Sequence, residues 1–192
     1  MKILTIGSDR KLFEEGSDVQ NRIIEYGTLF DELHIIVFTT RYQKHGVRFK
    51  NTKVGDNVWI YPTYSRNKFF YIVDAVHIGK RIFRTMHFRQ GHDCISTQDP
   101  FEAGLAGWFL KRASHISLQL QIHTDFFSPY FGRESVLNRI RVRIATFLIP
   151  RADGIRVVSK RIKESLESRI PPSTPLRQGY AGRARLWRAS KN

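Results

Sequence analysis

A histidine and an aspartate stand two residues apart where an apolar strand is expected to end. The segment is LQLQIHTDFFSPYF, residues 118–131, and His123 and Asp125 follow alternating apolar residues that run up to Ile122. A histidine at this position can bind a hydroxyl or a phosphate, or transfer a proton near neutral pH. Asp125 is close enough in sequence to orient the imidazole or to hold a sugar hydroxyl. A single histidine at a strand end is more often structural, so the spacing alone leaves both interpretations open.

Further small or polar residues stand where helices are expected to begin. These are Gly16, Ser17, Asp18, Asp99, Glu102 and Ser159. The exposed N–H groups and the dipole at a helix start favour an anion or a sugar hydroxyl. The alternative for each is helix capping, with Asp99 as a cap and Glu102 reaching back to the backbone.

Several kinds of site are disfavoured because their motifs are missing from the sequence. There is no G-x-G-x-x-G after the first strand, no G-x-x-x-x-G-K-[ST], no Asp-x-Asp pair and no G-x-S-x-G. These absences argue against a Rossmann dinucleotide site, a P-loop, a carboxylate-held metal and a serine hydrolase. The single cysteine, Cys94, excludes an intrachain disulfide, and no Cys/His cluster has zinc spacing. We therefore expect no metal and no tightly bound cofactor.

The elements that must position these residues alternate between strands and helices. Strands are expected at 2–6, 33–39, 57–62, 93–97, 117–123 and 154–159, and helices at 18–32, 67–89, 99–112, 135–149 and 160–168. Residues 40–56 are expected to form a loop or a weak edge hairpin. This order predicts one Rossmann-like three-layer α/β/α sandwich with a mostly parallel sheet. Ligands of such sheets bind beyond the carboxyl ends of the strands, where the candidate residues lie.

The charge of the chain favours polyanionic partners. The 192 residues include 32 Lys and Arg against 17 Asp and Glu, a net charge of +15. Nucleic acid, anionic lipid headgroups and nucleotide phosphates are all attracted by such a field. No nucleic-acid-binding motif occurs and most aromatic residues fall on expected core faces, so no specific nucleic acid is expected. The expected helices 67–89 and 135–149 are candidates for contact with an anionic membrane surface; the alternative is core packing with solvated charges.

The start of the chain lacks a secretory signal, and no run of about 18 apolar residues occurs. Together with the single cysteine, this predicts a cytoplasmic protein that can bind peripherally at the inner face of the membrane.

Three segments in order resemble the amino-terminal half of family 4 glycosyltransferases of the GT-B fold. They are TQDPFEAGLAGWFLKR (97–112), LQLQIHTDFFSPYF (118–131) and PRADGIRVVSKRIKESL (150–166). In that family a strand ends in a "dpf..gl.g" segment, the next strand ends in His-x-Asp, and a later "aD.v..vS" segment opens the last strand and helix of the first domain. The segment EEGSDVQNRIIEYG (14–27) resembles the family's glycine loop and first helix, but it has one glycine, Gly16, where the family has two adjacent ones.

The resemblance implies a function. Such enzymes transfer a sugar from a nucleotide-sugar to a glycan or lipid-linked acceptor with retention of anomeric configuration and without a metal. The amino-terminal domain mainly binds acceptor, while its glycine loop and strand-end histidine face the donor. The resemblance therefore assigns His123 as the catalytic candidate and Gly16, Ser17, Asp18 and Asp125 as donor- or acceptor-facing residues. Its assignment of Asp99, Glu102 and Ser159 is weaker.

The resemblance covers about residues 1–170. We expect these to form the amino-terminal domain and residues 171–192, which start at PPSTP, to form a basic and irregular tail. The family's second domain, which holds most donor contacts and a Glu-x7-Glu signature, has no counterpart here. The chain is therefore expected to be inactive without a donor-binding domain. Two alternatives stay open: a non-catalytic module that binds a sugar or nucleotide, and a basic nucleic-acid-binding domain.

Overall fold

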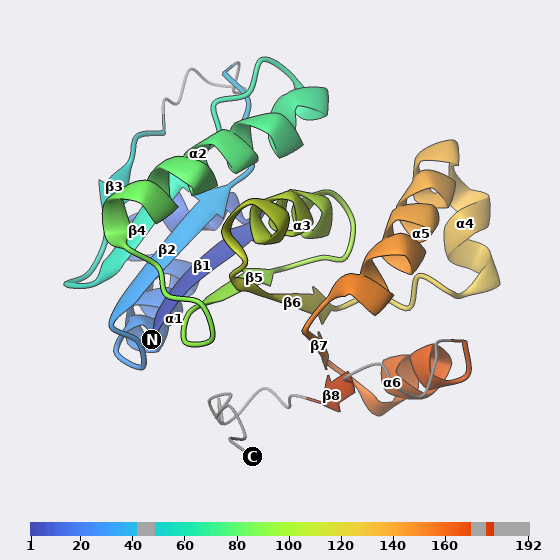
Figure 1. Ribbon diagram of the computed structural model, residues 1–192. Helices are drawn as coiled ribbons and strands as arrows, with labels where there is room; N and C mark the ends of the chain where they lie inside the picture. Colours follow the sequence, from blue (N-terminus) through green and yellow to red (C-terminus); the bar gives the residue numbers. More distant parts are fainter. Residues whose placement is uncertain (42–48, 170–175, 179–192) are drawn as a thin grey trace.

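A computed structural model describes residues 1–41, 49–169 and 176–178 (Figure 1). Within these residues one eight-stranded sheet has the order β3-β4-β2-β1-β5-β6-β7-β8. The strands are β1 Lys2–Gly7, β2 Glu32–Val37, β3 Thr52–Lys53, β4 Val58–Pro62, β5 Cys94–Thr97, β6 Ser117–Ile122, β7 Gly154–Val157 and β8 Leu176–Gln178. All neighbouring pairs are parallel except β3 with β4. The carboxyl ends of the parallel strands therefore share one edge of the sheet.

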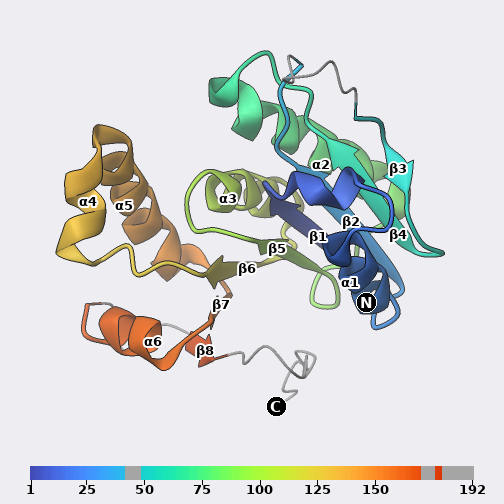
Figure 2. The same ribbon diagram turned by 180° about the vertical axis from the view of Figure 1, so that it is seen from behind.

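Helices connect most of the parallel strands. They are α1 Asp18–Gly27, α2 Tyr71–Met86, α3 Glu102–Ser114, α4 Pro129–Glu134, α5 Val136–Leu148 and α6 Lys160–Glu167, with the 3-10 turns η1 Arg10–Phe13, η2 Lys68–Phe70 and η3 Ile149–Arg151. Figure 1 shows α2 and α3 across one face of the sheet, and Figure 2 shows α1 from behind. Each helix that follows a parallel strand begins near the carboxyl edge, because the chain has just left the strand there.

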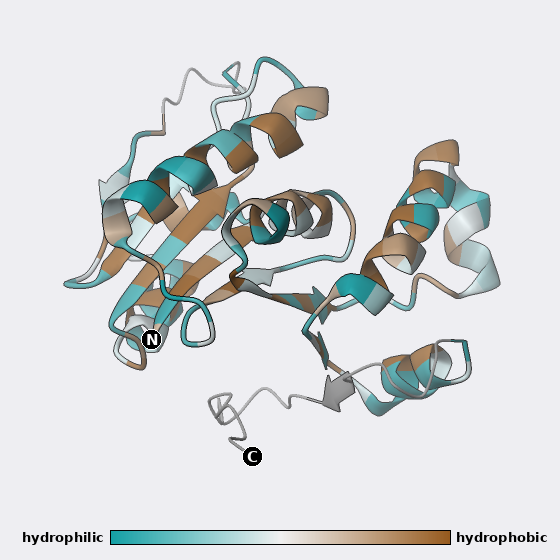
Figure 3. Ribbon diagram, in the orientation of Figure 1, coloured by the Kyte–Doolittle hydropathy of each residue, from teal (hydrophilic) through white to brown (hydrophobic). Residues whose placement is uncertain are grey.

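Two apolar clusters hold the layers together, one on each face. The larger joins strand residues such as Leu4, Leu118 and Leu120 to residues of α2, α3, α5 and α6, including Leu110 and Ile162. The smaller joins residues of β2 and β4 to Val19 and Ile23 of α1. Figure 3 shows the corresponding apolar colouring along the central strands. The α/β/α sandwich predicted from the sequence is thus confirmed.

The change of face follows from the strand order. From β1 the chain moves through α1 to β2, in one direction along the sheet. From β4 it moves through α2 back to β5 on the other side of β1, and then outward to β6, β7 and β8. Right-handed crossovers in opposite directions place their helices on opposite faces. The strand order therefore reverses between β1 and β5, which is where sheets of this kind form a crevice.

Most predicted boundaries agree with the structure within a few residues, two helices end earlier than predicted, and one helix was not predicted. The helix predicted over 18–32 ends at Gly27, because Glu32 already pairs with Lys2 in the sheet. The helix predicted over 67–89 ends at Met86, where His87 adopts a left-handed conformation with φ 49°. Helix α4 lies in a segment for which no helix was predicted.

The prediction of an irregular tail over 171–192 is wrong at Leu176–Gln178. These residues form β8, which pairs in parallel with β7. The remainder of that predicted tail lies outside the described residues. Residues 40–56 were expected to form a loop or a weak edge hairpin; within them Thr52–Lys53 form β3, which pairs antiparallel with β4, and residues 42–48 are not among those described. Among the helices of the described part, none is long and apolar enough to cross a membrane.

Candidate functional site

A pocket of about 400 Å³ lies at the carboxyl ends of β6 and β7. It is lined by Asp125, Ser128, Tyr130, Phe131, Glu134, Ser159, Arg161 and Ile162. These residues come from the loop after β6, from α4 and from the first turn of α6. The lining combines two carboxylates, one guanidinium, hydroxyl groups and two aromatic rings. That is a set able to bind a polyhydroxylated ligand with apolar faces.

The Asp125 side chain is held in place by a hydrogen bond from α6. The Ser165 Oγ of α6 donates a hydrogen bond of 2.9 Å to Asp125 Oδ1. The next residue, Phe126, is buried and packs its ring edge-on against Phe101 at the start of α3. The loop after β6 is therefore held on both sides, and the carboxylate is placed before any ligand arrives.

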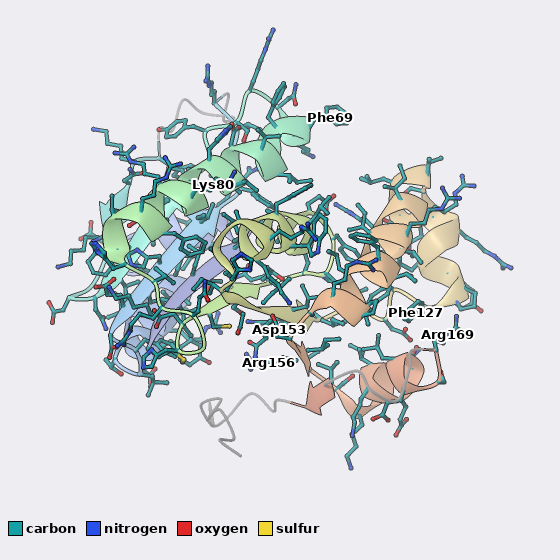
Figure 4. The ribbon with its side chains drawn as sticks, viewed as in Figure 1. Phe69, Lys80, Phe127, Asp153, Arg156 and Arg169 are labelled. Carbon is teal, nitrogen blue, oxygen red and sulfur yellow. The ribbon has the colours of Figure 1, made fainter. Side chains whose placement is uncertain are left out.

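A second contact holds the end of α6 against the loop after β6. The Arg169 guanidinium lies 5.5 Å from the centroid of the Phe127 ring, and Figure 4 shows the two side chains together near α6. Ser159 caps α6, because its Oγ accepts a hydrogen bond from Ile162 N at 3.3 Å. The capping interpretation of Ser159 is thus correct, and the same residue also lines the pocket. Sequence reasoning placed Asp125 and Ser159 in separate motifs, and the fold brings them together.

His123 follows β6 directly but does not line this pocket. The residue as a whole is exposed to solvent. Partial desolvation of the ring, and then the positive charge of Arg156 on β7, lower its pKa below the usual 6.5. The imidazole is therefore predominantly neutral at pH 7. In that form it can accept a proton or a hydrogen bond through one ring nitrogen and donate through the other.

Gly16, Ser17 and Asp18 lie at the start of α1, on the sheet face opposite to α5, and none of them lines the pocket. Gly16 has φ 74° and open space around its α-carbon. Ser17 caps α1 by accepting from Gln20 N at 3.2 Å, and its hydroxyl donates to Lys11 O at 2.7 Å. The capping interpretation of Ser17 is therefore correct.

Asp99 and Glu102 have structural partners. Asp99 Oδ1 accepts hydrogen bonds from Phe101 N at 2.8 Å and Ala103 N at 3.2 Å, as the capping interpretation predicts. Burial raises the pKa of the Asp99 carboxyl. The alternative interpretation of Glu102, a side chain that reaches back to the backbone, is wrong: its carboxylate binds Arg141 of α5, at 2.9 Å from Nε and 2.8 Å from Nη2.

Six pocket residues were not among the sequence candidates: Ser128, Tyr130, Phe131, Glu134, Arg161 and Ile162. Three of them, Tyr130, Phe131 and Glu134, lie on α4, and a serine followed by proline, Ser128 and Pro129, marks the start of that helix. This was the available signal in the sequence. Glu134 is oriented by Asn138, whose Nδ2 donates to Glu134 Oε2 at 3.0 Å. Across the described ranges, no three His, Cys, Asp or Glu side chains form a group that could hold a metal ion.

One comparison with known proteins shows the fold, and another shows the family. A solved structure of sucrose-phosphate synthase from Thermosynechococcus elongatus superimposes with a TM-score of 0.64, covering 93% of this chain and 87% of that one at 13% sequence identity. At that identity the likeness is one of fold. A comparison with curated proteins gives no match. The sequence model of Glycosyltransferase Family 4 matches residues 30–178, which include β6, the pocket and β8. The chain therefore belongs to glycosyltransferase family 4.

Proposed function

We propose that this chain is the acceptor-side domain of a retaining glycosyltransferase, and that its pocket binds a sugar of a glycan or lipid-linked acceptor. The observation that carries the proposal is the pocket between β6, α4 and α6, with its two carboxylates and two aromatic rings. A nucleotide-sugar would be the co-substrate, and no metal is invoked.

The pocket chemistry suits a saccharide. The carboxylates of Asp125 and Glu134 can each accept hydrogen bonds from sugar hydroxyls, and charge-assisted bonds of this kind are the stronger ones. The Tyr130 and Phe131 rings offer apolar surfaces for the C–H face of a pyranose. The Asp125 carboxylate is already oriented by Ser165, so binding would need little reorganisation of the site.

The reacting centre would lie beside this pocket rather than inside it. His123 stands two residues before Asp125 at the same strand end, and its predominantly neutral imidazole can bond a hydroxyl of the transferred sugar. Gly16 and Asp18 stand at the start of α1, nearer to the strand reversal. We assign these three to the donor side, where a donor-binding domain would meet the carboxyl edge. The described domain is expected to show no turnover by itself.

A saccharide titration tests the acceptor pocket. Methyl glycosides of glucose, galactose, mannose and N-acetylglucosamine would be titrated into the purified 192-residue chain and followed by saturation-transfer NMR. We expect at least one to bind, and Asp125→Asn to weaken that binding about tenfold or more, because a charge-assisted bond contributes roughly 1.5–3 kcal/mol. Asp56→Asn is the matched control, since Asp56 is an exposed aspartate that precedes β4 at the opposite edge of the sheet.

The results separate three functions. Absence of saccharide binding, or binding that Asp125→Asn leaves unchanged, would contradict the pocket assignment. Saccharide binding without transfer, after a donor-binding domain is supplied, would instead favour a non-catalytic binding module. Binding of single-stranded DNA that falls steeply with salt, with no saccharide response, would favour a nucleic-acid-binding domain.

A further inference from the structure

The charge of the pocket lining is opposite in sign to the charge of the whole chain. Asp125 and Glu134 contribute two carboxylates to the lining, and Arg161 contributes one guanidinium. The lining is therefore net negative, whereas the chain carries a net charge of +15. Side chains of one sign around a concave site raise the local concentration of ligands of the opposite sign. The pocket thus favours a ligand with a positive group, although the protein as a whole attracts anions.

Both carboxylates are held by neutral donors. The Ser165 hydroxyl donates to Asp125 Oδ1 at 2.9 Å. The side-chain amide of Asn138 donates to Glu134 Oε2 at 3.0 Å. Within the described part of the chain, neither carboxylate takes part in an ion pair. Their donors therefore orient the two groups without compensating their charge, and one oxygen of each, Asp125 Oδ2 and Glu134 Oε1, is left to bind a ligand.

The guanidinium of the lining does not neutralise these carboxylates. Arg161 forms no ion pair with Asp125 or Glu134, although all three residues line the same pocket. Arg161 is exposed on the first turn of α6, and a side chain of this length has many accessible rotamers. Asp125 is half-buried and held by its hydrogen bond. A positive group of a ligand can therefore reach Asp125 while the guanidinium points to solvent.

The substituents of a saccharide differ in how well they suit two carboxylates. An ammonium group is positive, has three N–H donors and has no acceptor, whereas a hydroxyl is neutral and donates once. Hydrogen bonds between a cation and a carboxylate are roughly twice as strong as those between neutral groups. A uronate or a phosphate would bring a further negative charge against Asp125 and Glu134, which is unfavourable. The lining therefore favours a saccharide with a free amine over a neutral or an acidic one.

We propose that the saccharide bound in this pocket is an amino sugar, with its ammonium group against Asp125 Oδ2 and Glu134 Oε1. The sugar ring would lie against Tyr130 and Phe131 of the lining. This inference rests on the proposed function, since it names the class of saccharide that the acceptor pocket takes. An N-acetylated amino sugar would be a poor ligand, because acetylation removes the positive charge and leaves a single N–H donor.

Titrations with matched glycosides test the role of the amine. Methyl glycosides of glucosamine, glucose, N-acetylglucosamine and glucuronic acid, and of their galactose counterparts, would be titrated into the purified 192-residue chain. Binding would be followed by saturation-transfer NMR at about pH 6.5 and about 50 mM salt. In at least one series we expect the amino sugar to bind at least tenfold tighter than the neutral parent. The net charge of the chain predicts the opposite order, with the uronide tightest.

Two pairs of substitutions locate the preference for the amine. Asp125→Asn with Glu134→Gln should remove it, because both charges are lost while the shapes of the side chains are kept. The affinity for the amino sugar should then fall to that for the neutral parent. Asp56→Asn with Glu25→Gln is the matched control, since it removes two acidic charges from exposed positions outside the pocket lining. The control should keep the preference.

A change of pH gives a measurement that needs no substitution. The amine of an amino sugar titrates in the range of an α-amino group, at about pH 7.7, so it is neutral at about pH 9. The preference for the amino sugar should therefore disappear between about pH 6.5 and about pH 9. The ionisable residues of the lining are Asp125, Tyr130, Glu134 and Arg161. Binding of the neutral glycoside over the same range reports any change in these residues.

The outcomes separate this inference from the function on which it rests. Neutral glycosides that bind as tightly as the amino sugars, with binding that Asp125→Asn weakens, would overturn the inference and keep the acceptor pocket. Tightest binding of a uronide would also overturn it, and would assign the selection to Arg161. A preference for the amine that persists at about pH 9, or in the doubly substituted pocket, would place the amine elsewhere and overturn it too. Absence of binding by every saccharide would contradict both proposals.

Discussion

At the scale of single residues, the environment of His123 sets what it can do. Partial desolvation and the charge of Arg156 both favour the neutral imidazole. Arg156 pairs in register with Gln121, two residues before His123, so the cation comes from the adjacent strand. The histidine was chosen from the sequence because it ends a strand, but the cation that affects it is 33 residues away in sequence. That relation depends on the β6–β7 register, which the local sequence does not reveal.

Removing the Arg156 charge tests this account. Arg156→Gln should raise the pKa of His123 toward 6.5, because desolvation stays and the positive neighbour is lost. The measurement is an NMR titration of the His123 ring protons between pH 4.5 and 8. A folded pKa below the unfolded one means that the neutral histidine contributes stability above about pH 6.5, and that this contribution is lost as the pH falls. The variant should lose less stability on acidification.

The His123 titration has a control variant and a result that would contradict the account. Arg22→Gln removes an exposed charge from α1, on the far side of the strand reversal, and should leave the His123 titration unchanged. An unchanged or lower pKa of His123 in Arg156→Gln would show that Arg156 does not act on the imidazole.

At the scale of elements, α3 owes its position to small residues. Gly104 and Gly107 lie on the side of α3 that faces the sheet, and both are buried. A β-carbon at Gly107 would stand 2.7 Å from Thr97 Cγ2 and 2.9 Å from Leu118 Cδ1. The helix can approach β5 and β6 only because those positions lack side chains. This close packing places Asp99 and Glu102 in their structural roles, and it supports the loop that carries Asp125.

Filling this contact should be destabilising. Gly107→Ala should lower the free energy of unfolding by about 1–3 kcal/mol, because overpacking outweighs the roughly 1 kcal/mol gain in helix propensity. Urea unfolding followed by circular dichroism measures the change. Gly132→Ala on α4 is the matched control, since its β-carbon would have 3.9 Å to the nearest side chain. The control should be neutral or slightly stabilising. Gly107→Ala as stable as the parent would mean that α3 can move away from the sheet at little cost.

The elements were largely predictable, and the exceptions have physical causes. Long helices and apolar strands can be recognised in the sequence, because burial of one face or of both faces sets the spacing of their apolar residues. Helix α4 has six residues and includes Gly132, so its pattern is too short to be recognised. Strand β8 follows a proline-rich segment, and only its pairing with β7 makes it a strand. The Glu102–Arg141 pair joins two helices 39 residues apart, so capping was the more plausible local interpretation.

At the scale of the whole molecule, a buried carboxylate makes the stability of the fold depend on pH. Asp93 is fully buried and accepts hydrogen bonds from Lys2 N at 2.7 Å, Arg89 N at 2.6 Å and His92 Nδ1 at 2.9 Å. Desolvation raises the pKa of its carboxyl, but these hydrogen bonds outweigh that effect and hold the pKa below 3.8. The carboxylate ties the start of β1 to the turn before β5.

Neutralising Asp93 should therefore weaken the whole fold. Asp93→Asn should lower the free energy of unfolding at pH 7 by about 2–4 kcal/mol, since it turns one acceptor into a donor that faces a backbone N–H. A lowered folded pKa means that the stabilisation is present above the unfolded pKa of about 3.9 and is lost as pH falls through the folded value. Urea unfolding between pH 3 and 7 should show a shallower acid dependence in the variant. Parallel pH curves would contradict this role.

Strand β8 also has a consequence for assembly. Because β8 runs parallel to β7, Gln178 lies at the carboxyl edge, paired with Val157, which is two residues before Ser159 of the pocket. In the proposed glycosyltransferase, a domain fused after that residue would begin at the carboxyl edge, where the pocket opens, rather than on the far side of the sheet. With a short flexible connection, its effective concentration at the pocket would be in the millimolar range, so even a weak contact between the two would be largely formed. The direction of one short edge strand would thus favour the meeting of two separately folded domains.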